Sequence, residues 1–315
     1  ILLCISSVAL ASSQCGLRLS KALNKTSKRY ERAIIGGTNV TSPDKWPWQI
    51  LLISSISGTE EDIKVCGGTI VGEQWVLTAA HCVENFNDSS RQLVLAGASY
   101  ISEFEKELAS NVTEVFIHPS RDNEYKTNDI ALLKLDAPLV FSNVIAPICL
   151  PSPTQSIPND GRAVVTGFGR LNVDGTNETM SDGRLREAIV PIIDPEVCEE
   201  RWSHAAPGYE ELSIMIWRQR RVVCASSIDH GTHLGDSGGP LMMTASDGRW
   251  FQIGITAFIR CESDDCDAPG DGIRGDLFPK AFTDVRKYCD WIKETTGGEV
   301  SCQEEVTLED VEIEA

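Results

Sequence analysis

Three segments, met in a fixed order along the chain, constrain this sequence most. LTAAHC occupies 77–82, NDIALLKL occupies 128–135 and GDSGGP occupies 235–240. They carry His81, Asp129 and Ser237: a base, a carboxylate that can hold the imidazole in one tautomer, and a hydroxyl nucleophile whose proton the base can take. Each residue alone has an ordinary structural explanation, such as a turn or a loop cap, and GxSxG alone is a weak signal. Together they predict one nucleophilic site assembled from three parts of the chain.

The pattern between the ends of the chain is typical of an all-β protein. Short runs rich in Val, Ile and Leu, such as WQILLIS, RQLVLAG and WFQIGITAF, are separated by clusters of Gly, Pro, Asn and Asp. This spacing is typical of barrels and sandwiches. One helix is predicted over 285–295, where Val285, Tyr288, Trp291 and Ile292 recur at helical intervals.

The three motifs together resemble those of the trypsin and chymotrypsin family of serine endopeptidases, and the resemblance covers residues 34–296. It implies two antiparallel six-stranded β-barrels with a catalytic cleft between them and a C-terminal α-helix. His81 and Asp129 would come from the first barrel, and Ser237 from the second. The backbone N–H groups of Gly235 and Ser237 would form the oxyanion hole.

The same resemblance implies activation by cleavage before the segment IIGG. The new α-amino group of Ile34 would then pair with Asp236. Relatives usually carry Arg or Lys directly before the cut, whereas this chain has Arg32 followed by Ala33. Cleavage after Arg32 would displace the amine by up to ~3.5 Å, the length of one extended residue. We therefore expect productive cleavage after Ala33.

The expected substrate pocket departs from the family pattern. Gly231 stands where trypsins have Asp, and Lys280 takes the place of a pocket glycine. Ala257, Phe258 and Ile259 replace Ser-Trp-Gly along the cleft wall, which removes a hydroxyl that usually supports the triad carboxylate. An enclosed ammonium favours a carboxylate partner, so we expect cleavage after Asp or Glu. Two alternatives stay open: a pocket narrowed by Ile259 to small apolar residues, and a blocked pocket in which an acid from the preceding loop pairs with Lys280.

Eleven cysteines point to an oxidising location. Cys4 falls in the apolar start of the chain, which leaves an even number. By resemblance, six of them pair as Cys66–Cys82, Cys198–Cys224 and Cys15–Cys149. The remaining four allow three connectivities, of which 261 with 266 and 289 with 302 are favoured by loop proximity. Ala163 and Met243 stand where relatives have one further bridge, and His233 replaces one half of another.

Charge divides the chain into parts. Residues 1–11 are interpreted as the remnant of a signal peptide, 12–33 as a basic pro-segment of charge +5, and 297–315 as an acidic tail of charge −7. The net charge of −18 then leaves −16 for the protease-like body. So acidic a body argues against nucleic acid or an anionic membrane as partner. The tail is most simply a solvated appendage. Five glycosylation sequons begin at Asn24, Asn39, Asn87, Asn111 and Asn177.

The sequence therefore predicts a secreted, extracellular serine endopeptidase made as a zymogen and acting as a monomer. It predicts no cofactor and no metal: His81 has no second ligand at a usable spacing, and Glu103, Glu105 and Glu107 show no calcium-binding pattern. The expected partners are peptide or protein substrates and protein protease inhibitors. The alternative function is a binding or regulatory homologue with weak or absent turnover.

Overall fold

The structure is a computed structural model. It describes residues 15–18, 34, 37–55, 63–84, 91–103, 109–123, 127–169, 182–203, 221–227, 231–258 and 279–311. The expected signal remnant, most of the basic pro-segment, Ile259 and the pair Cys261–Cys266 lie outside the described residues.

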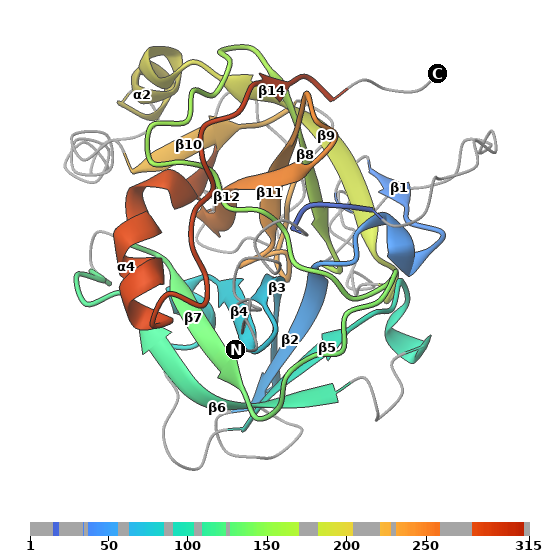
Figure 1. Ribbon diagram of the computed structural model, residues 1–315. Helices are drawn as coiled ribbons and strands as arrows, with labels where there is room; N and C mark the ends of the chain where they lie inside the picture. The colour runs from blue at the N-terminus through green and yellow to red at the C-terminus, as the bar shows by residue number, and fades with distance from the viewer. Residues whose placement is uncertain are drawn as a thin grey trace, which may run out of the picture.

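Six strands close into the first barrel, which occupies the lower half of Figure 1. They are β2 (Gln49–Ser55), β3 (Ile63–Gly72), β4 (Trp75–Thr78), β5 (Arg91–Ala96), β6 (Ala109–Ile117) and β7 (Ala131–Leu135). Their order around the barrel is β2-β3-β4-β7-β6-β5, and every pairing is antiparallel. Strand β2 buries Ile50, Leu51 and Leu52 in succession.

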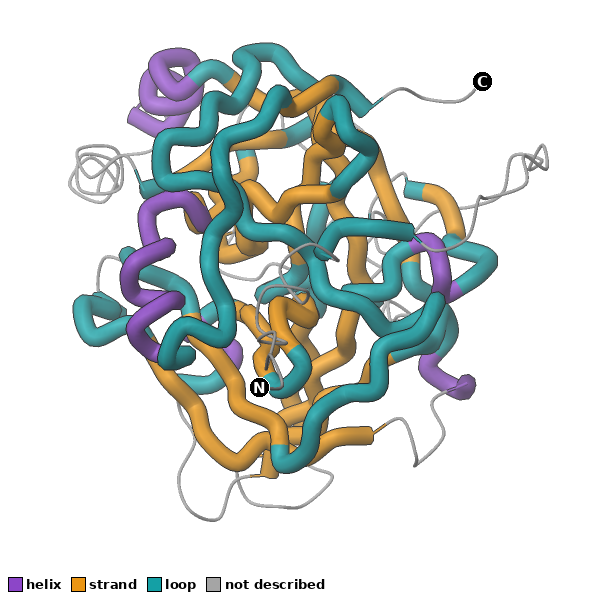
Figure 2. The backbone as a smooth tube through the Cα atoms, in the orientation of Figure 1, coloured by secondary structure: helices purple, strands orange, loops and turns teal. Residues whose placement is uncertain are grey.

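The second barrel repeats this order with β8 (Arg162–Gly167), β9 (Arg186–Ile193), β10 (Val222–Ala225), β11 (Pro240–Ala245), β12 (Trp250–Phe258) and β13 (Lys280–Asp284). The ladder runs β8-β9-β10-β13-β12-β11 and returns to β8. Two short strands extend it, β1 (Thr38–Asn39) beside β9 and β14 (Leu308–Glu309) beside β11. Figure 2 shows the strands gathered into these two groups. The prediction of two antiparallel six-stranded barrels is confirmed.

The helices are few. The predicted C-terminal helix is present as η7 (Val285–Tyr288) followed by α4 (Cys289–Thr295). Helix α2 (Pro195–Ser203) was not expected, although its start carries a local signal: Asp194 Oδ1 accepts from the N–H of Glu196 at 2.8 Å, directly after the helix-compatible Pro195. The described residues also form three further short 3₁₀ turns, η2 (Pro43–Lys45), η4 (Ala80–Cys82) and η5 (Ile101–Glu103). Among the described residues, no helix has both the length and the apolar character needed to span a bilayer.

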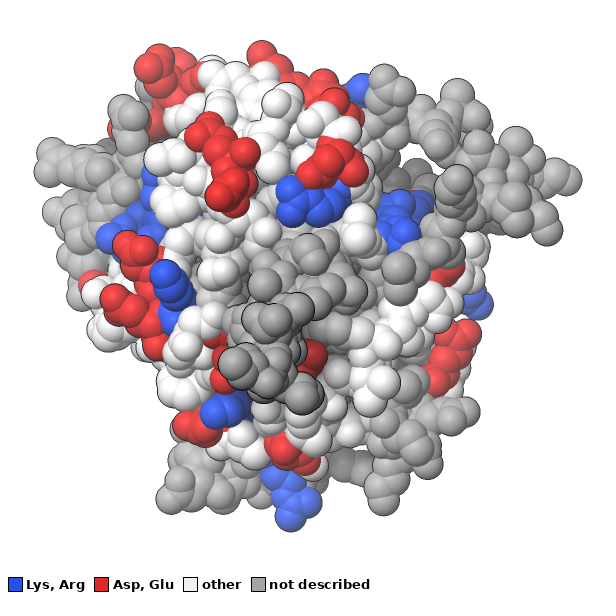
Figure 3. Space-filling view, in the orientation of Figure 1, with Lys and Arg blue, Asp and Glu red and all other residues white. Residues whose placement is uncertain are grey.

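The expectation of a solvated acidic tail is wrong for the described part of that segment. After α4 the chain turns back and runs from the first barrel to the second, ending at β14 (Figure 1). Val300 is buried against the first barrel, and Leu308 is buried where β14 pairs with β11. The acidic residues between Val300 and Leu308 are exposed. The run of acids in the sequence therefore did not indicate that apolar residues among them are buried. In Figure 3 acidic side chains gather over this segment and over α2.

Four disulfides are present among the described residues: Cys15–Cys149, Cys66–Cys82, Cys198–Cys224 and Cys289–Cys302. All four agree with the predicted pairs. Ala163 and Met243, which stand where relatives have a further bridge, are both fully buried in the same apolar cluster of the second barrel. Close apolar packing therefore replaces that bridge.

The two barrels meet through buried side chains that carry specific polar contacts. Thr69 Oγ1 of the first barrel donates to Gln252 Oε1 of the second at 2.6 Å. Thr166 Oγ1 of the second donates to Gln49 Oε1 of the first at 2.6 Å. Buried polar groups need such partners, so these bonds favour one docking of the barrels. That docking positions the loops that carry the predicted site.

Candidate active site

His81 and Asp129 lie together at the first barrel. His81 sits on η4 directly after β4, and Asp129 lies two residues before β7, the strand that pairs with β4. His81 Nδ1 is 2.7 Å from Asp129 Oδ2, and the backbone N–H of His81 donates to Asp129 Oδ1 at 2.9 Å. A carboxylate at Nδ1 makes that nitrogen the donor, so Nε2 is left as a base.

The Asp129 carboxylate is buried, with the residue only 4% exposed. Burial alone would raise its pKa, but the attraction and hydrogen bonds of His81, together with the charge of Arg121, outweigh burial and hold the pKa below its usual value. The side chain of Asp129 therefore stays ionised at neutral pH. His81 remains reachable from solvent, since its side chain is 24% exposed.

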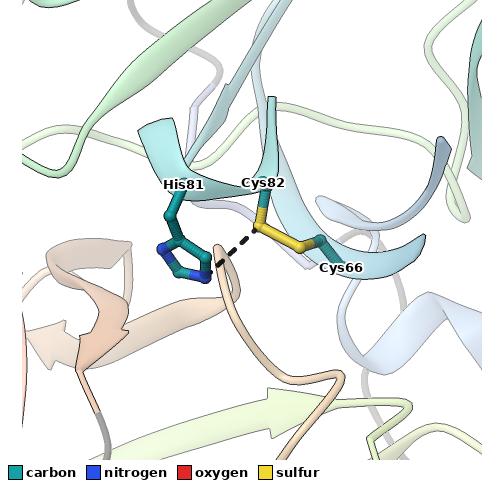
Figure 4. Close-up of side chains that lie close together, drawn as sticks. All are labelled: Cys66, His81 and Cys82. Atoms are coloured by element: carbon teal, nitrogen blue, oxygen red, sulfur yellow. Dashed lines mark hydrogen bonds between the residues drawn. A yellow bond between two sulfur atoms is a disulfide. The ribbon is translucent and has the colours of Figure 1, made fainter. Parts of the chain in front are cut away.

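A disulfide fixes the segment that carries His81. Cys66 of β3 is bonded to Cys82, and Cys82 Sγ lies 3.9 Å from His81 Nε2 (Figure 4). Donor atoms of Cys66, His81 and Cys82 lie within 4.8 Å of one another, the spacing of a metal site. Zinc ligation by cysteine needs thiolates, and these two sulfurs are bonded to each other. The two cysteines of this cluster therefore form a structural disulfide beside His81 and are not metal ligands.

Asn128 builds the turn that presents Asp129, and the motif analysis assigned it no role. Its φ is 51°, in the left-handed region that asparagine tolerates better than most residues. Its Nδ2 donates to Ser120 O at 2.7 Å, and its Oδ1 accepts from Arg221 NH1 at 2.6 Å and from Tyr288 OH at 3.2 Å. Arg221 lies directly before β10, and Tyr288 lies in η7 directly after β13, so the Asp129 turn depends on both barrels.

Ser237 lies on the turn that precedes β11, at the same junction. The N–H of Gly67, on β3 beside Cys66, donates to Ser237 O at 2.7 Å. Gly238 has a φ of 82°, and a Cβ there would overlap Thr78 Oγ1 and Gly67 O. Only glycine therefore lets the Ser237 turn approach the first barrel so closely. Within the described part of the chain, no hydrogen bond joins Ser237 Oγ to His81.

The same turn offers backbone donors. Gly235 has a φ of 95°, and neither its N–H nor that of Ser237 donates to a backbone carbonyl of the described residues. The neighbouring N–H groups are engaged: that of Asp236 donates to His233 O at 3.0 Å and that of Gly238 to Thr256 O at 2.8 Å. Among the described N–H groups at 235–238, the two expected to form an oxyanion hole are thus the two that make no hydrogen bond to a backbone carbonyl.

Asp236 is completely buried and held by main-chain donors. Its carboxylate accepts from the N–H of Gly169 and from that of His233, both at 2.8 Å. Burial raises its pKa to about 6, although these hydrogen bonds and the charge of Lys280 act in the opposite direction. Ile34, its expected activation partner, is fully buried in the core of the second barrel, with a φ of 40° in the uncut chain.

Of the residues expected to line the substrate pocket, Gly231 and Lys280 lie next to each other. Gly231 is buried, and a Cβ on it would lie 3.7 Å from Lys280 Cε. Lys280, at the start of β13, is 5% exposed. Burial lowers its pKa to about 8, and attraction to Asp236 partly offsets this effect. Its charged neighbour is therefore Asp236, which the sequence had linked only to activation. Of the cleft wall, the backbone of Phe258 pairs with Ala281 in β13.

Comparison with known proteins agrees with this architecture. A family model described as Trypsin matches residues 34–292. The chain is 33% identical over 288 residues to Ovochymase from Halocynthia roretzi, a match that covers 89% of this chain. It spans only 16% of the length of that relative. Because the family model matches most of the chain and the fold has the paired barrels, the chain belongs to the trypsin family.

Proposed function

We propose that this protein is a serine endopeptidase in which Ser237, His81 and Asp129 form the catalytic triad. One observation carries the proposal: Asp129 binds both Nδ1 and the backbone N–H of His81, at 2.7 and 2.9 Å. This arrangement leaves Nε2 as the base, at the junction where Gly67 also holds the Ser237 turn.

In the proposed reaction, Ser237 Oγ attacks the peptide carbonyl while His81 Nε2 takes its proton. The developing oxyanion accepts from the N–H groups of Gly235 and Ser237, a contribution of roughly 3 to 4 kcal/mol per donor. The ionised Asp129 stabilises the imidazolium without taking the proton. His81 then protonates the leaving amine, and water hydrolyses the acyl-enzyme by the same steps in reverse. These residues need no cofactor.

We further propose that the protein is a zymogen cut between Ala33 and Ile34. A branched residue at a φ of 40° is strained, by roughly 1 to 3 kcal/mol. The φ torsion of Ile34 includes the carbonyl carbon of Ala33, so cleavage of this bond removes the restraint. The freed amine would then supply a charge partner for the buried Asp236.

The proposed preference at the residue before the cut is Asp or Glu. The buried ammonium of Lys280 beside the side-chain-free Gly231 supports it. Asp236 opposes it, because it already attracts Lys280 from inside the protein. The deciding experiment compares Lys280→Gly with the parent on matched peptides ending in Asp, Glu, Ala, Val and Arg. A parent indifferent to Asp and Glu, and unchanged by the substitution, would remove Lys280 from the specificity argument.

One specific observation favours a second function, a binding or regulatory homologue with little turnover. The Lys280 side chain is buried beside Gly231, where the substrate pocket is expected, and Ala257 lacks the family's supporting hydroxyl. The deciding experiment uses protein engineered to begin at Ile34. We expect a fluorophosphonate probe to label the parent and not Ser237→Ala. Correctly processed parent that neither labels nor cleaves a peptide library would establish the second function.

Secretion into an oxidising compartment is proposed on the four disulfides among the described residues. Asn111 is exposed on β6, which suits a glycan there. Peptide or protein substrates and protein inhibitors are the proposed partners, and the acidic body disfavours nucleic acid.

A further inference from the structure

A buried arginine lies beside the proposed catalytic carboxylate. Arg121, in the loop between β6 and β7, has a side chain only 6% exposed. Its NH1 lies 3.6 Å from Asp129 Oδ1 and donates to Thr127 O at 3.3 Å. Arg121 lies seven residues before the NDIALLKL motif and belongs to none of the three motifs, so sequence reasoning had no reason to select it.

A second charged residue fixes the guanidinium. Arg121 Nε and NH2 both donate to Glu84 Oε2, at 3.2 and 3.1 Å. Glu84 lies two residues after Cys82, on the segment that carries His81. The Arg121–Glu84 pair therefore bridges the segment of the base and the turn of the carboxylate. With both side chains largely buried, the pair is shielded from solvent and salt.

The carboxylate has few other supports. Among the described residues, both hydrogen bonds to the Asp129 carboxylate come from His81. Ala257 stands where the family resemblance places a supporting hydroxyl. The remaining titratable groups that face Asp129 are Lys64, which donates to His81 O, and Tyr288. In the described part of the chain, Arg121 is the arginine or lysine that forms an ion pair with the Asp129 carboxylate.

We infer that Arg121, held by Glu84, is a positioning residue that orients the Asp129 carboxylate toward His81 in place of the missing hydroxyl. The inference rests on the proposed function. Its electrostatic effect has a definite sign: the Arg121 cation helps to hold the pKa of Asp129 below its usual value, and it repels an imidazolium formed at His81 during the reaction.

The test measures the pH dependence of fluorophosphonate labelling and of kcat/KM in protein beginning at Ile34. Arg121→Gln should lower the plateau rate about ten- to a hundredfold, because the carboxylate loses its orientation. It should also shift the acid limb of the pH profile, where the rate falls at low pH, to higher pH by roughly half a unit or more, because the imidazolium loses a repelling cation. Arg121→Lys should restore the acid limb but only part of the rate, since an ammonium lacks the planar fork.

Glu84→Gln moves the same limb in the opposite direction. Removing this negative charge strengthens the field of Arg121 at His81, so the acid limb should fall. Arg184→Gln is the matched control, because that arginine is 52% exposed and pairs with Asp182; it should leave rate and pH profile unchanged. Thermal midpoints identify folding defects, and Arg121→Lys and Glu84→Gln keep the test decisive if Arg121→Gln misfolds.

The outcomes separate two failures. A parent that is not labelled at Ser237 overturns the proposed function. A labelled parent whose acid limb is the same in Arg121→Gln, Arg121→Lys and Glu84→Gln overturns this inference alone. A fall in thermal midpoint with an unshifted acid limb also overturns it, because Arg121 would then only stabilise its loop.

Discussion

Replacing Lys280 by Met should stabilise the protein near neutral pH. Lys280 and Asp236 are both enclosed in the second barrel, and the pKa of each is displaced toward its neutral form, to about 8 and about 6 respectively. Between pH 6 and 8 the folded protein therefore holds two charges that burial disfavours. Methionine has a similar length and no charge to desolvate.

The magnitude follows from the displacement of the lysine pKa. A fall from 10.5 to about 8 corresponds to about 3 kcal/mol of unfavourable ionisation at pH 7. Because the folded-state pKa of Lys280 is depressed, the lysine costs no stability above the unfolded value of 10.5, and the stability present there is lost as the pH falls through 8. The pKa of about 8 already includes the attraction to Asp236, so we expect a net gain of roughly 1 to 3 kcal/mol once the site has relaxed around the methionine.

The assay is thermal unfolding from pH 6 to 10, with Ser237→Ala in every variant to prevent self-cleavage. The midpoint of Lys280→Met should exceed that of the parent by roughly 3 to 10 °C at pH 7. The difference should shrink as the pH rises through 8, where the parent lysine becomes neutral. Lys287→Met, at an exposed lysine of η7, is the matched control and should change little.

Adding Asp236→Asn to Lys280→Met completes a double-mutant cycle that isolates the interaction of the two charges. Asp236 has a raised folded-state pKa, so its stabilising contribution is present below pH 3.8 and is lost as the pH rises through about 6. If Lys280→Met unfolds at a lower temperature than the parent at pH 7, with a difference independent of pH, the pair is net favourable and the reasoning fails.

Three further predictions concern the site and the C-terminal segment. Gly238→Ala should cost several kcal/mol and abolish labelling at Ser237, because the new Cβ meets Thr78 Oγ1 at a positive φ; chemical denaturation and probe labelling check this, and a fully active variant would refute it. Asn128→Gly keeps the left-handed turn but loses the contacts to Ser120, Arg221 and Tyr288, so kcat/KM should fall at least tenfold while Ser142→Gly, a loop control, stays active. Replacing both cysteines of the last disulfide, Cys289→Ser with Cys302→Ser, should lower the free energy of unfolding by roughly 2 to 4 kcal/mol and expose the 297–311 segment to proteolysis. If this variant resists proteolysis as well as the parent does, β14 alone holds the segment.

Much of the chemistry could be predicted from short, local motifs. LTAAHC, NDIALLKL and GDSGGP identified three side chains whose chemical roles depend on residue type, and Cys82 falls within the first of them. Local periodicity likewise predicted the helix at 285–295, because its apolar spacing is independent of distant contacts. The number of barrels came from family resemblance, since the two halves share a strand order but no visible sequence repeat.

Other features depend on residues that only the tertiary structure brings together. Asn128 is an ordinary loop residue in the sequence, and its role arises from Arg221 and Tyr288 of the second half of the chain. The acids at 297–311 suggested a solvated tail, whereas a few interspersed apolar residues dock it across both barrels.

The charge partners show the same division most clearly. From the sequence, Lys280 had six candidate acids in the adjacent loop, and Arg121 had none that the motifs would suggest. The fold places Asp236 near Lys280, and Glu84 with Asp129 around Arg121. Residue type alone determined which side chains can carry charge and attack a carbonyl. Packing decided which charges are buried together. The Coulomb energy of two charges depends on their distance and solvent exposure, and the spacing of residues along the sequence predicts neither.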